Sequence, residues 1–160
     1  MGARNVTGDN QILNVGVLGF GYWGPNQVRN FAALRSRGVE VRAVADLDPV
    51  RRIQAADMFP EIATVERAET IIDDPEIDAV VIATPAHTHY EIGQAALLAG
   101  KHILVEKPVT TKLADAQRLT SLASELGLTL MVGHTYEYAP AVDYLHGLLN
   151  SGDIGDTLYM

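Results

Sequence analysis

The sequence predicts an α/β fold in which a parallel β-sheet is covered by helices on both faces. From residue 12 onward, short apolar runs alternate with amphipathic stretches, the pattern of strand, helix and strand repeated along the chain. The runs at 80–82 and 103–105 are apolar at every position, which is typical of strands buried on both faces. Right-handed crossovers place the carboxyl ends of all strands at one edge of such a doubly wound sheet. We therefore expect the chemistry at that edge.

Strands and helices can be placed from their patterns and from the residues that bound them. Gly38 is expected to end the first helix, and Asp48 to cap the second ahead of Pro49. Thr88 and Glu91 have the spacing of a capping box at the start of the third. Strands are predicted at residues 12–18, 39–46, 78–83, 102–106 and 128–133, with a weaker one at 62–65. Helices are predicted at residues 25–38, 48–58, 88–100, 112–126 and 139–150.

Composition narrows the class of protein. The 160 residues are 48% hydrophobic and 20% charged, which suits one compact domain. The net charge of −8 argues against binding to nucleic acid or to an anionic membrane. Without cysteine, disulfides and thiolate chemistry are excluded, and no apolar run is long enough to span a membrane. Residues 1–11 lack the apolar stretch of a signal peptide, so we expect a disordered tail and a cytoplasmic protein.

A glycine-rich turn follows the first predicted strand and opens the first predicted helix. The first glycine permits a tight turn, the second lets the backbone approach a pyrophosphate, and the third allows close packing of helix and strand. The diphosphate of a dinucleotide would meet free N–H groups at the positive end of the helix. The alternative is a plain glycine-rich turn. The sequence of this candidate cofactor-binding turn is Gly19-Phe20-Gly21-Tyr22-Trp23-Gly24.

An acidic residue ends the second predicted strand. Asp46 lies 22 residues after Gly24, where a carboxylate can accept hydrogen bonds from both hydroxyls of the adenosine ribose. The alternative is that Asp46 only caps the next helix, but Asp48 already fills that role. A carboxylate here repels a 2′-phosphate, so NAD is predicted rather than NADP. Arg51 or Arg52 could fold back and soften that preference.

The fourth strand leads into a second candidate cofactor segment. In the strand order 3-2-1-4-5-6, Thr84 and Pro85 flank the cofactor opposite the glycine turn, although a structural turn alone would explain them nearly as well. His87 and His89 form an H-x-H pair, but no third ligand is evident, so no metal is predicted. His89 is predicted to be the more inward of the two and to contact the cofactor.

The ends of the fifth and sixth strands carry further candidates. Glu106 and Lys107 leave the sheet at the crevice, where a lysine can donate a hydrogen bond to a reacting oxygen and relay a proton. Pro108 would fix this turn, through a cis bond in one interpretation. A solvated lysine before a helix is the alternative. His134 and Tyr136 can approach the nicotinamide or pack against the sheet edge, and the sequence does not decide between these roles.

Three segments together resemble the Gfo/Idh/MocA oxidoreductase family. They are the glycine turn 19–24, the segment 83–85 with His89, and the segment 99–108, of which Glu-Lys-Pro is the most specific part. The resemblance implies hydride transfer between a nicotinamide cofactor and a secondary alcohol of a sugar, nucleotide sugar or cyclitol. It assigns the catalytic lysine to Lys107. It also implies that the full-length form is a homo-oligomer.

The same resemblance implies a second α/β domain that binds the substrate. We expect residues 12–150 to form the dinucleotide-binding domain and residues 151–160 to begin the second domain, which is cut off, so that this chain alone is inactive. A non-catalytic nucleotide sensor of the same fold is an alternative function, and an assembly module with an unused crevice is another. Lys107 argues against a sensor, which needs no proton relay.

Overall fold

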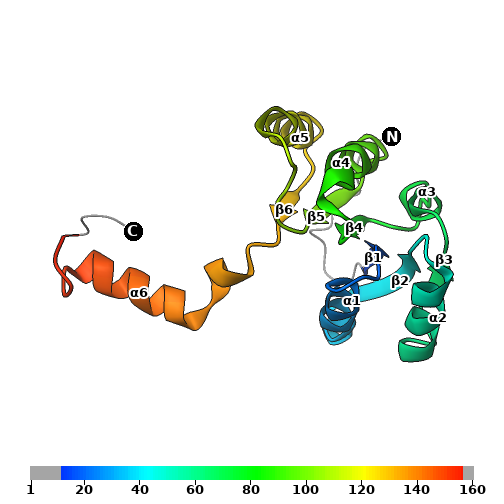
Figure 1. The fold of residues 1–160 in the computed structure, drawn as a ribbon, viewed down its shortest axis with the longest axis horizontal. Helices are drawn as coiled ribbons and strands as arrows, with labels where there is room; N and C mark the ends of the chain where they lie inside the picture. Colours follow the sequence, from blue (N-terminus) through cyan, green and yellow to red (C-terminus); the bar gives the residue numbers. More distant parts are fainter. Residues whose placement is uncertain (1–11, 157–160) are drawn as a thin grey trace.

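The structure, a computed structural model, describes residues 12–156. The predicted tail at 1–11 lies outside these residues, as do the last four residues of the chain. Within 12–156, six parallel strands form one sheet in the order β3-β2-β1-β4-β5-β6, so the predicted doubly wound Rossmann topology is confirmed (Figure 1). The strands are β1 (Leu13–Leu18), β2 (Val39–Ala45), β3 (Ala63–Val65), β4 (Ala79–Ile82), β5 (His102–Val105) and β6 (Leu130–Val132).

Helices cover both faces of this sheet, as the apolar strand interiors predict. One face packs on α1 (Gly24–Ala32) and α2 (Pro49–Met58), through buried residues such as Val28 and Ala55. The other packs on α3 (Ala68–Ile72), α4 (His89–Leu98) and α5 (Leu113–Glu125), which contribute Ile71, Leu97 and Leu119. In the described part of the chain, no helix is long and apolar enough to cross a membrane.

Two predicted helix boundaries differ from the structure. Gly38 is expected from the sequence to end the first helix, but α1 already stops at Ala32, and Gly38, with a φ of 81°, ends a separate 3-10 turn, η1 (Arg35–Arg37). The capping box at Thr88 is wrong. A 3-10 turn, η2 (Ala86–Thr88), leads directly into α4, so Thr88 has helical rather than extended dihedral angles. Its hydroxyl instead donates to the carbonyl oxygen of Pro85 at 2.8 Å.

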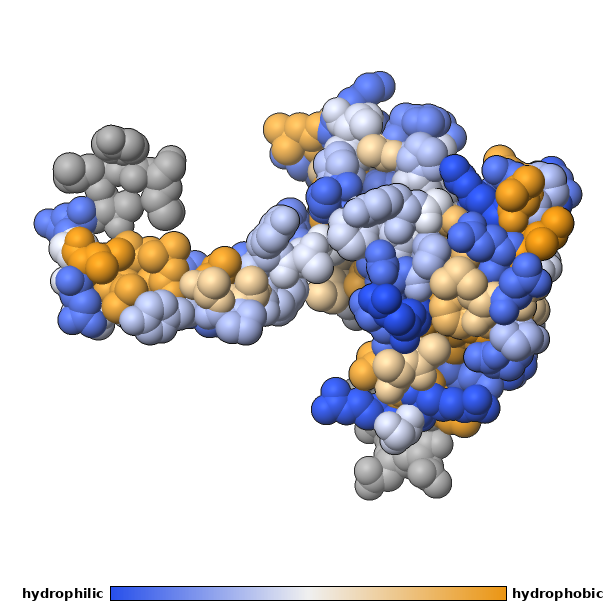
Figure 2. All heavy atoms as spheres, turned by 60° about the horizontal axis from the view of Figure 1, so that its bottom comes forward, coloured by the Kyte–Doolittle hydropathy of each residue, from blue (hydrophilic) through white to orange (hydrophobic). Residues whose placement is uncertain are grey.

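The last helix lies apart from the sheet. After β6, the turn η3 (Thr135–Tyr138) leads into α6 (Pro140–Ser151), which projects away from the rest of the described chain (Figure 1). None of its residues is buried. Figure 2 shows hydrophobic surface along this projecting arm. The sheet and α1 to α5 therefore form the packed unit that positions the site.

A buried lysine donates hydrogen bonds to the backbone at the amino-terminal edge of the sheet. Lys101 is 6% exposed, and its Nζ donates to the carbonyl oxygens of Asp74 at 2.6 Å and Ile77 at 2.7 Å. We expect Lys101→Met to lower the free energy of unfolding by about 1–3 kcal/mol, because two carbonyl groups lose a charged donor. Urea denaturation measures this loss. The exposed Lys112 is the control, and equal losses for Lys101→Met and Lys112→Met would contradict the assignment.

Candidate functional site

The glycine turn lies between the carboxyl end of β1 and the start of α1. Gly19 has a φ of 93°, and a Cβ there would lie 2.7 Å from the carbonyl oxygen of Ala83. A Cβ on Gly24 would collide with the carbonyl oxygen of Gly19. The first and third glycines are therefore required by the fold itself, which agrees with the roles predicted for them.

Gly21 differs from the other two glycines. A Cβ on Gly21 would meet only the guanidinium of Arg51, at 3.5 Å, which is ordinary van der Waals contact. The backbone at Gly21 is therefore not closed in by the fold. Within the described residues, no side chain caps the start of α1, so its first N–H groups have no side-chain partner. This combination suits the approach of an anion such as a diphosphate.

A pocket of about 560 Å³ lies in front of this turn. Five of the predicted cofactor-binding residues line it, namely Gly19, Gly21, Asp46, Thr84 and Pro85. They come from the ends of β1, β2 and β4, as expected for the crevice at the carboxyl edge of the sheet. The wall also includes residues that the sequence did not single out, among them Leu47, Glu66, Glu69 and Ile92.

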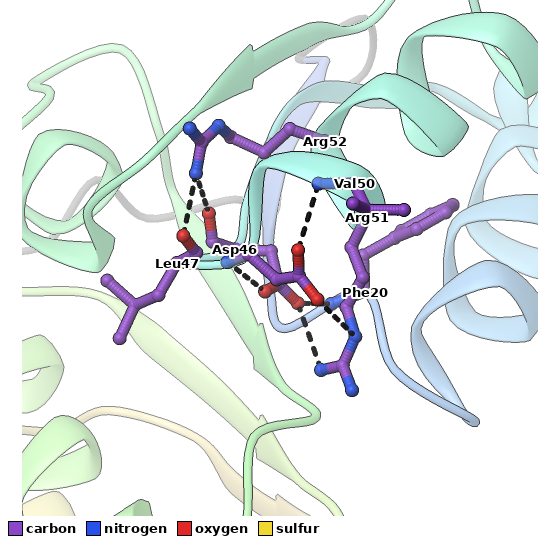
Figure 3. A network of polar contacts seen from close by, with 7 residues as sticks. Phe20, Asp46, Leu47, Val50, Arg51 and Arg52 are labelled. Carbon is purple, nitrogen blue, oxygen red and sulfur yellow. Dashed lines mark hydrogen bonds and ion pairs between the residues drawn. The ribbon is translucent and has the colours of Figure 1, made fainter.

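Asp46 lies at the centre of a polar network beside the pocket (Figure 3). Its Oδ2 accepts a hydrogen bond from the backbone N–H of Phe20 at 2.7 Å, and its Oδ1 accepts from that of Asp48 at 2.9 Å. Asp48 caps α2 as predicted, by accepting from Val50 N at 2.9 Å. Each carboxylate oxygen of Asp46 keeps a second acceptor lone pair. The residue thus links β2 to the glycine turn and can still accept two hydroxyl groups.

The two arginines after Asp46 have different positions (Figure 3). Arg52 Nη1 donates to the carbonyl oxygens of Asp46 at 2.8 Å and Leu47 at 2.9 Å, which holds this guanidinium on the backbone. Arg51 lines the pocket, with its side chain 49% exposed and its Nη1 3.6 Å from Asp46 Oδ2. Of the two, Arg51 therefore folds back into the pocket.

The pocket wall has an excess of negative charge. Arg51 is the one arginine or lysine among its lining residues, whereas four carboxylates line it, those of Asp46, Asp48, Glu66 and Glu69. Such a wall disfavours a ligand with an extra phosphate at this position. Arg51 is the group that can oppose this effect.

The histidine pair is split between the pocket and the protein interior. His87 lines the pocket, whereas His89 is 1% exposed, so the prediction that His89 is the more inward one is confirmed. The predicted contact of His89 with a cofactor needs correction. Both of its ring nitrogens face backbone carbonyl oxygens, of Thr84 and Pro108, each at 2.8 Å. The side chain supports the loops behind the pocket and does not line it.

The residues at the ends of β5 and β6 form a second group on the same edge of the sheet. Glu106 is buried, and its Oε1 accepts a hydrogen bond from Gln27 Nε2 of α1 at 2.5 Å. Lys107 is exposed, and the Lys107–Pro108 peptide is cis, as one interpretation of the sequence had it. His134 and Tyr136 are also exposed. Among the residues described, this group does not line the pocket.

Of the three aromatic residues in the glycine turn, one is buried and two are exposed. Phe20 is a core residue that packs edge-to-face on Phe59, with ring centroids 6.3 Å apart, and it serves the site through its backbone N–H. Tyr22 and Trp23 are exposed and pack on each other. Between residues 12 and 156, no group of three side chains is arranged to hold a metal ion.

Sequence reasoning missed three polar residues of the site. Gln27 is in the first turn of α1, directly after the glycine turn, and its position there is the signal that was available. Glu66 follows β3, which the sequence predicts only weakly, so the residue at its end drew no attention. Glu69 is in the first turn of the short helix α3 that comes next, and no sequence pattern marks it.

Comparisons with known proteins agree with this geometry. The model of an oxidoreductase family with an NAD-binding Rossmann fold matches residues 13–134. An inositol 2-dehydrogenase of Mycolicibacterium smegmatis is 35% identical over 149 residues, which are 92% of this chain and 43% of that protein. The chain thus spans about two fifths of the length of the curated relatives it matches, for example 41% of an oxidoreductase of Escherichia coli.

Solved structures show the same fold. Biliverdin reductase of Synechocystis, determined with biliverdin and NADP+, is 30% identical, with a TM-score of 0.80 over 90% of this chain and 44% of that one. The scyllo-inositol dehydrogenase of Lactobacillus casei with bound NAD(H) and scyllo-inositol has a TM-score of 0.81 at 24% identity, over 91% and 43% of the two chains. The two neighbours hold different nicotinamide cofactors.

Proposed function

Because the chain belongs to the oxidoreductase family with an NAD-binding Rossmann fold, we propose that it is the NAD-binding domain of a dehydrogenase. The proposed reaction moves a hydride between the nicotinamide and a secondary alcohol of a sugar, nucleotide sugar or cyclitol. The observation that carries the proposal is the pocket in which Asp46, bonded to the glycine turn, keeps an acceptor on each oxygen. Relatives named as dehydrogenases of inositol support the class of substrate.

Different residues of the chain are proposed to bind different parts of the cofactor. The backbone at Gly21 and the first turn of α1 hold the diphosphate, and Asp46 accepts the hydroxyls of the adenosine ribose. Thr84 and Pro85 form the opposite wall. When bound, the nicotinamide accepts or supplies the hydride. Lys107, exposed at the end of β5, donates a hydrogen bond to the reacting oxygen and moves its proton.

The proposed cofactor is NAD. A 2′-phosphate would lie beside Asp46, which is 9% exposed, and beside the acidic wall of the pocket. Repulsion between these charges is strong where water is excluded. The hydroxyl of NAD is uncharged and finds an acceptor in Asp46.

Substrate binding is proposed for a separate domain. We assign residues 12–150 to the nucleotide domain and 151–160 to the start of a second one, since the relatives are more than twice as long as the matched region. A homo-oligomer remains our proposal for the full-length form. Turnover is proposed to need that second domain, so binding is the property to test on this chain.

Replacing Gly21 by alanine tests the proposed function. A methyl group there meets only the Arg51 guanidinium inside the protein, at 3.5 Å, so we expect the free energy of unfolding to change by less than about 1 kcal/mol. The same methyl group would stand between the backbone and a diphosphate. We expect the dissociation constant for NADH to rise by at least about tenfold, measured by nicotinamide fluorescence.

Gly147→Ala is the control for this experiment. Gly147 is in α6, and a Cβ there meets nothing within 4 Å. NADH affinity should be unchanged in this variant. An unmodified chain without saturable NADH binding would refute the proposal, and so would a Gly21→Ala chain that binds as well as the unmodified one.

A further inference from the structure

His89 is a buried side chain that the proposed function does not use directly. It is the first residue of α4 and is 1% exposed. Its Nε2 lies 2.8 Å from the carbonyl oxygen of Thr84, and its Nδ1 lies 2.8 Å from the carbonyl oxygen of Pro108. One ring thus bridges the loop after β4 and the loop after β5, through Thr84 and Pro108, which are 24 residues apart in sequence.

Both loops carry parts of the proposed site. Thr84 lines the pocket, and its hydroxyl lies 2.7 Å from that of Thr88, which in turn donates to the Pro85 carbonyl. Pro108 directly follows Lys107. A displacement of either carbonyl group would therefore move the pocket wall or the proposed catalytic lysine. His89 is the described side chain that hydrogen-bonds to both segments.

The two acceptors determine what the ring must supply. A backbone carbonyl can only accept, and a neutral imidazole carries a single N–H. With carbonyl oxygens at hydrogen-bond distance from both nitrogens, both contacts are hydrogen bonds only if each ring nitrogen carries a proton. The positive end of the α4 dipole opposes such a charge. The two carbonyl dipoles that face the ring favour it.

We propose that His89 is a positioning residue, which donates to Thr84 and Pro108 at once and so holds the pocket wall and Lys107 in a fixed relation. This inference rests on the proposed function, because the two segments matter together only if a nicotinamide cofactor spans them.

The first test observes the ring directly. The full chain is labelled with ¹⁵N-histidine, and its five histidines are compared by NMR at pH 7 with those of His89→Gln to assign the His89 signals. We expect both ring nitrogens of His89 to carry protons, which exchange slowly with water because the ring is buried. A ring with one protonated and one bare nitrogen would overturn the double donation.

The second test measures the effect on the cofactor. Glutamine at position 89 can donate from one nitrogen only and cannot bridge the two carbonyls. We expect the dissociation constant for NADH to rise about tenfold in His89→Gln. Ile77→Ala is the control, because Ile77 is 2% exposed but precedes β4, at the opposite edge of the sheet from the pocket. It lowers stability without touching either loop, so its NADH affinity should stay near that of the unmodified chain.

The outcomes separate the two proposals. If His89→Gln and Ile77→Ala weaken NADH binding equally at matched stability, His89 is a core residue only and the positioning role is overturned. If the unmodified chain does not bind NADH, the proposed function fails, and the role of His89 at a cofactor site fails with it. In that case the NMR experiment still reports whether the ring bridges the two loops.

Discussion

Alanine at position 19 is expected to lower the free energy of unfolding by about 2–5 kcal/mol. Gly19 has a φ of 93°, and an L-residue in a left-handed conformation costs roughly 1–2 kcal/mol. The new Cβ would also lie 2.7 Å from the carbonyl oxygen of Ala83, and such overpacking typically costs about 1–3 kcal/mol. For a domain with about 5–15 kcal/mol of total stability, this is a large fraction.

Gly100 provides a matched control for this substitution. Its φ of 80° is similar, but a Cβ on Gly100 meets nothing within 4 Å. Gly100→Ala should therefore carry only the backbone part of the cost, about 1–2 kcal/mol. Urea unfolding of both variants gives the difference that is due to the contact with Ala83. Equal losses at the two positions would mean that the close approach of the turn to β4 is not as described.

Serine at position 46 is expected to shift the preference between the two nicotinamide cofactors toward NADPH by roughly 100-fold. The substitution removes the carboxylate that would face a 2′-phosphate and leaves Arg51, whose Nη1 is 3.6 Å from Asp46 Oδ2, free to pair with that phosphate. NADH should bind more weakly, because its ribose loses a bidentate acceptor. Titration of both reduced cofactors, followed by fluorescence, measures the ratio.

A double variant tests the part played by the arginine. Adding Arg51→Leu to Asp46→Ser should abolish most of the gain in NADPH affinity, because no other arginine or lysine is among the residues that line the pocket. Arg42→Gln controls for net charge, since this side chain is 50% exposed, pairs with Glu40 at 3.8 Å and does not line the pocket. A switch that survives the loss of Arg51 would contradict this explanation.

Most of the fold could be predicted because its signals are local and agree with one another. The apolar interiors of β4 and β5 and the cap at Asp48 are each determined by a few neighbouring residues. The capping-box prediction was wrong because it, too, relied on a local pattern alone. Thr88 has the required spacing, but the turn that precedes it sets its backbone in a helical conformation, which spacing does not encode.

The site could be predicted where it depends on backbone and on strand ends, and less well where it depends on side-chain direction. The glycine turn and Asp46 follow from register alone, since both come directly after strands. His89 has a position in sequence that suits a cofactor contact, but tertiary packing turns its ring toward the carbonyl oxygens of Thr84 and Pro108. The bond from Gln27 to Glu106 joins residues 79 apart, which no local pattern can indicate.

The exposed position of α6 determines how unfolding of this chain must be measured. A helix of 12 residues without a buried face is held together by local backbone bonds alone, and such helices are marginal in water. We therefore expect it to melt independently of the sheet, so that far-ultraviolet circular dichroism would record two transitions as one broadened curve. Amide protons of β1 and β4 exchange only when the sheet opens, and they are the probes that report the stability of the nucleotide-binding part by itself.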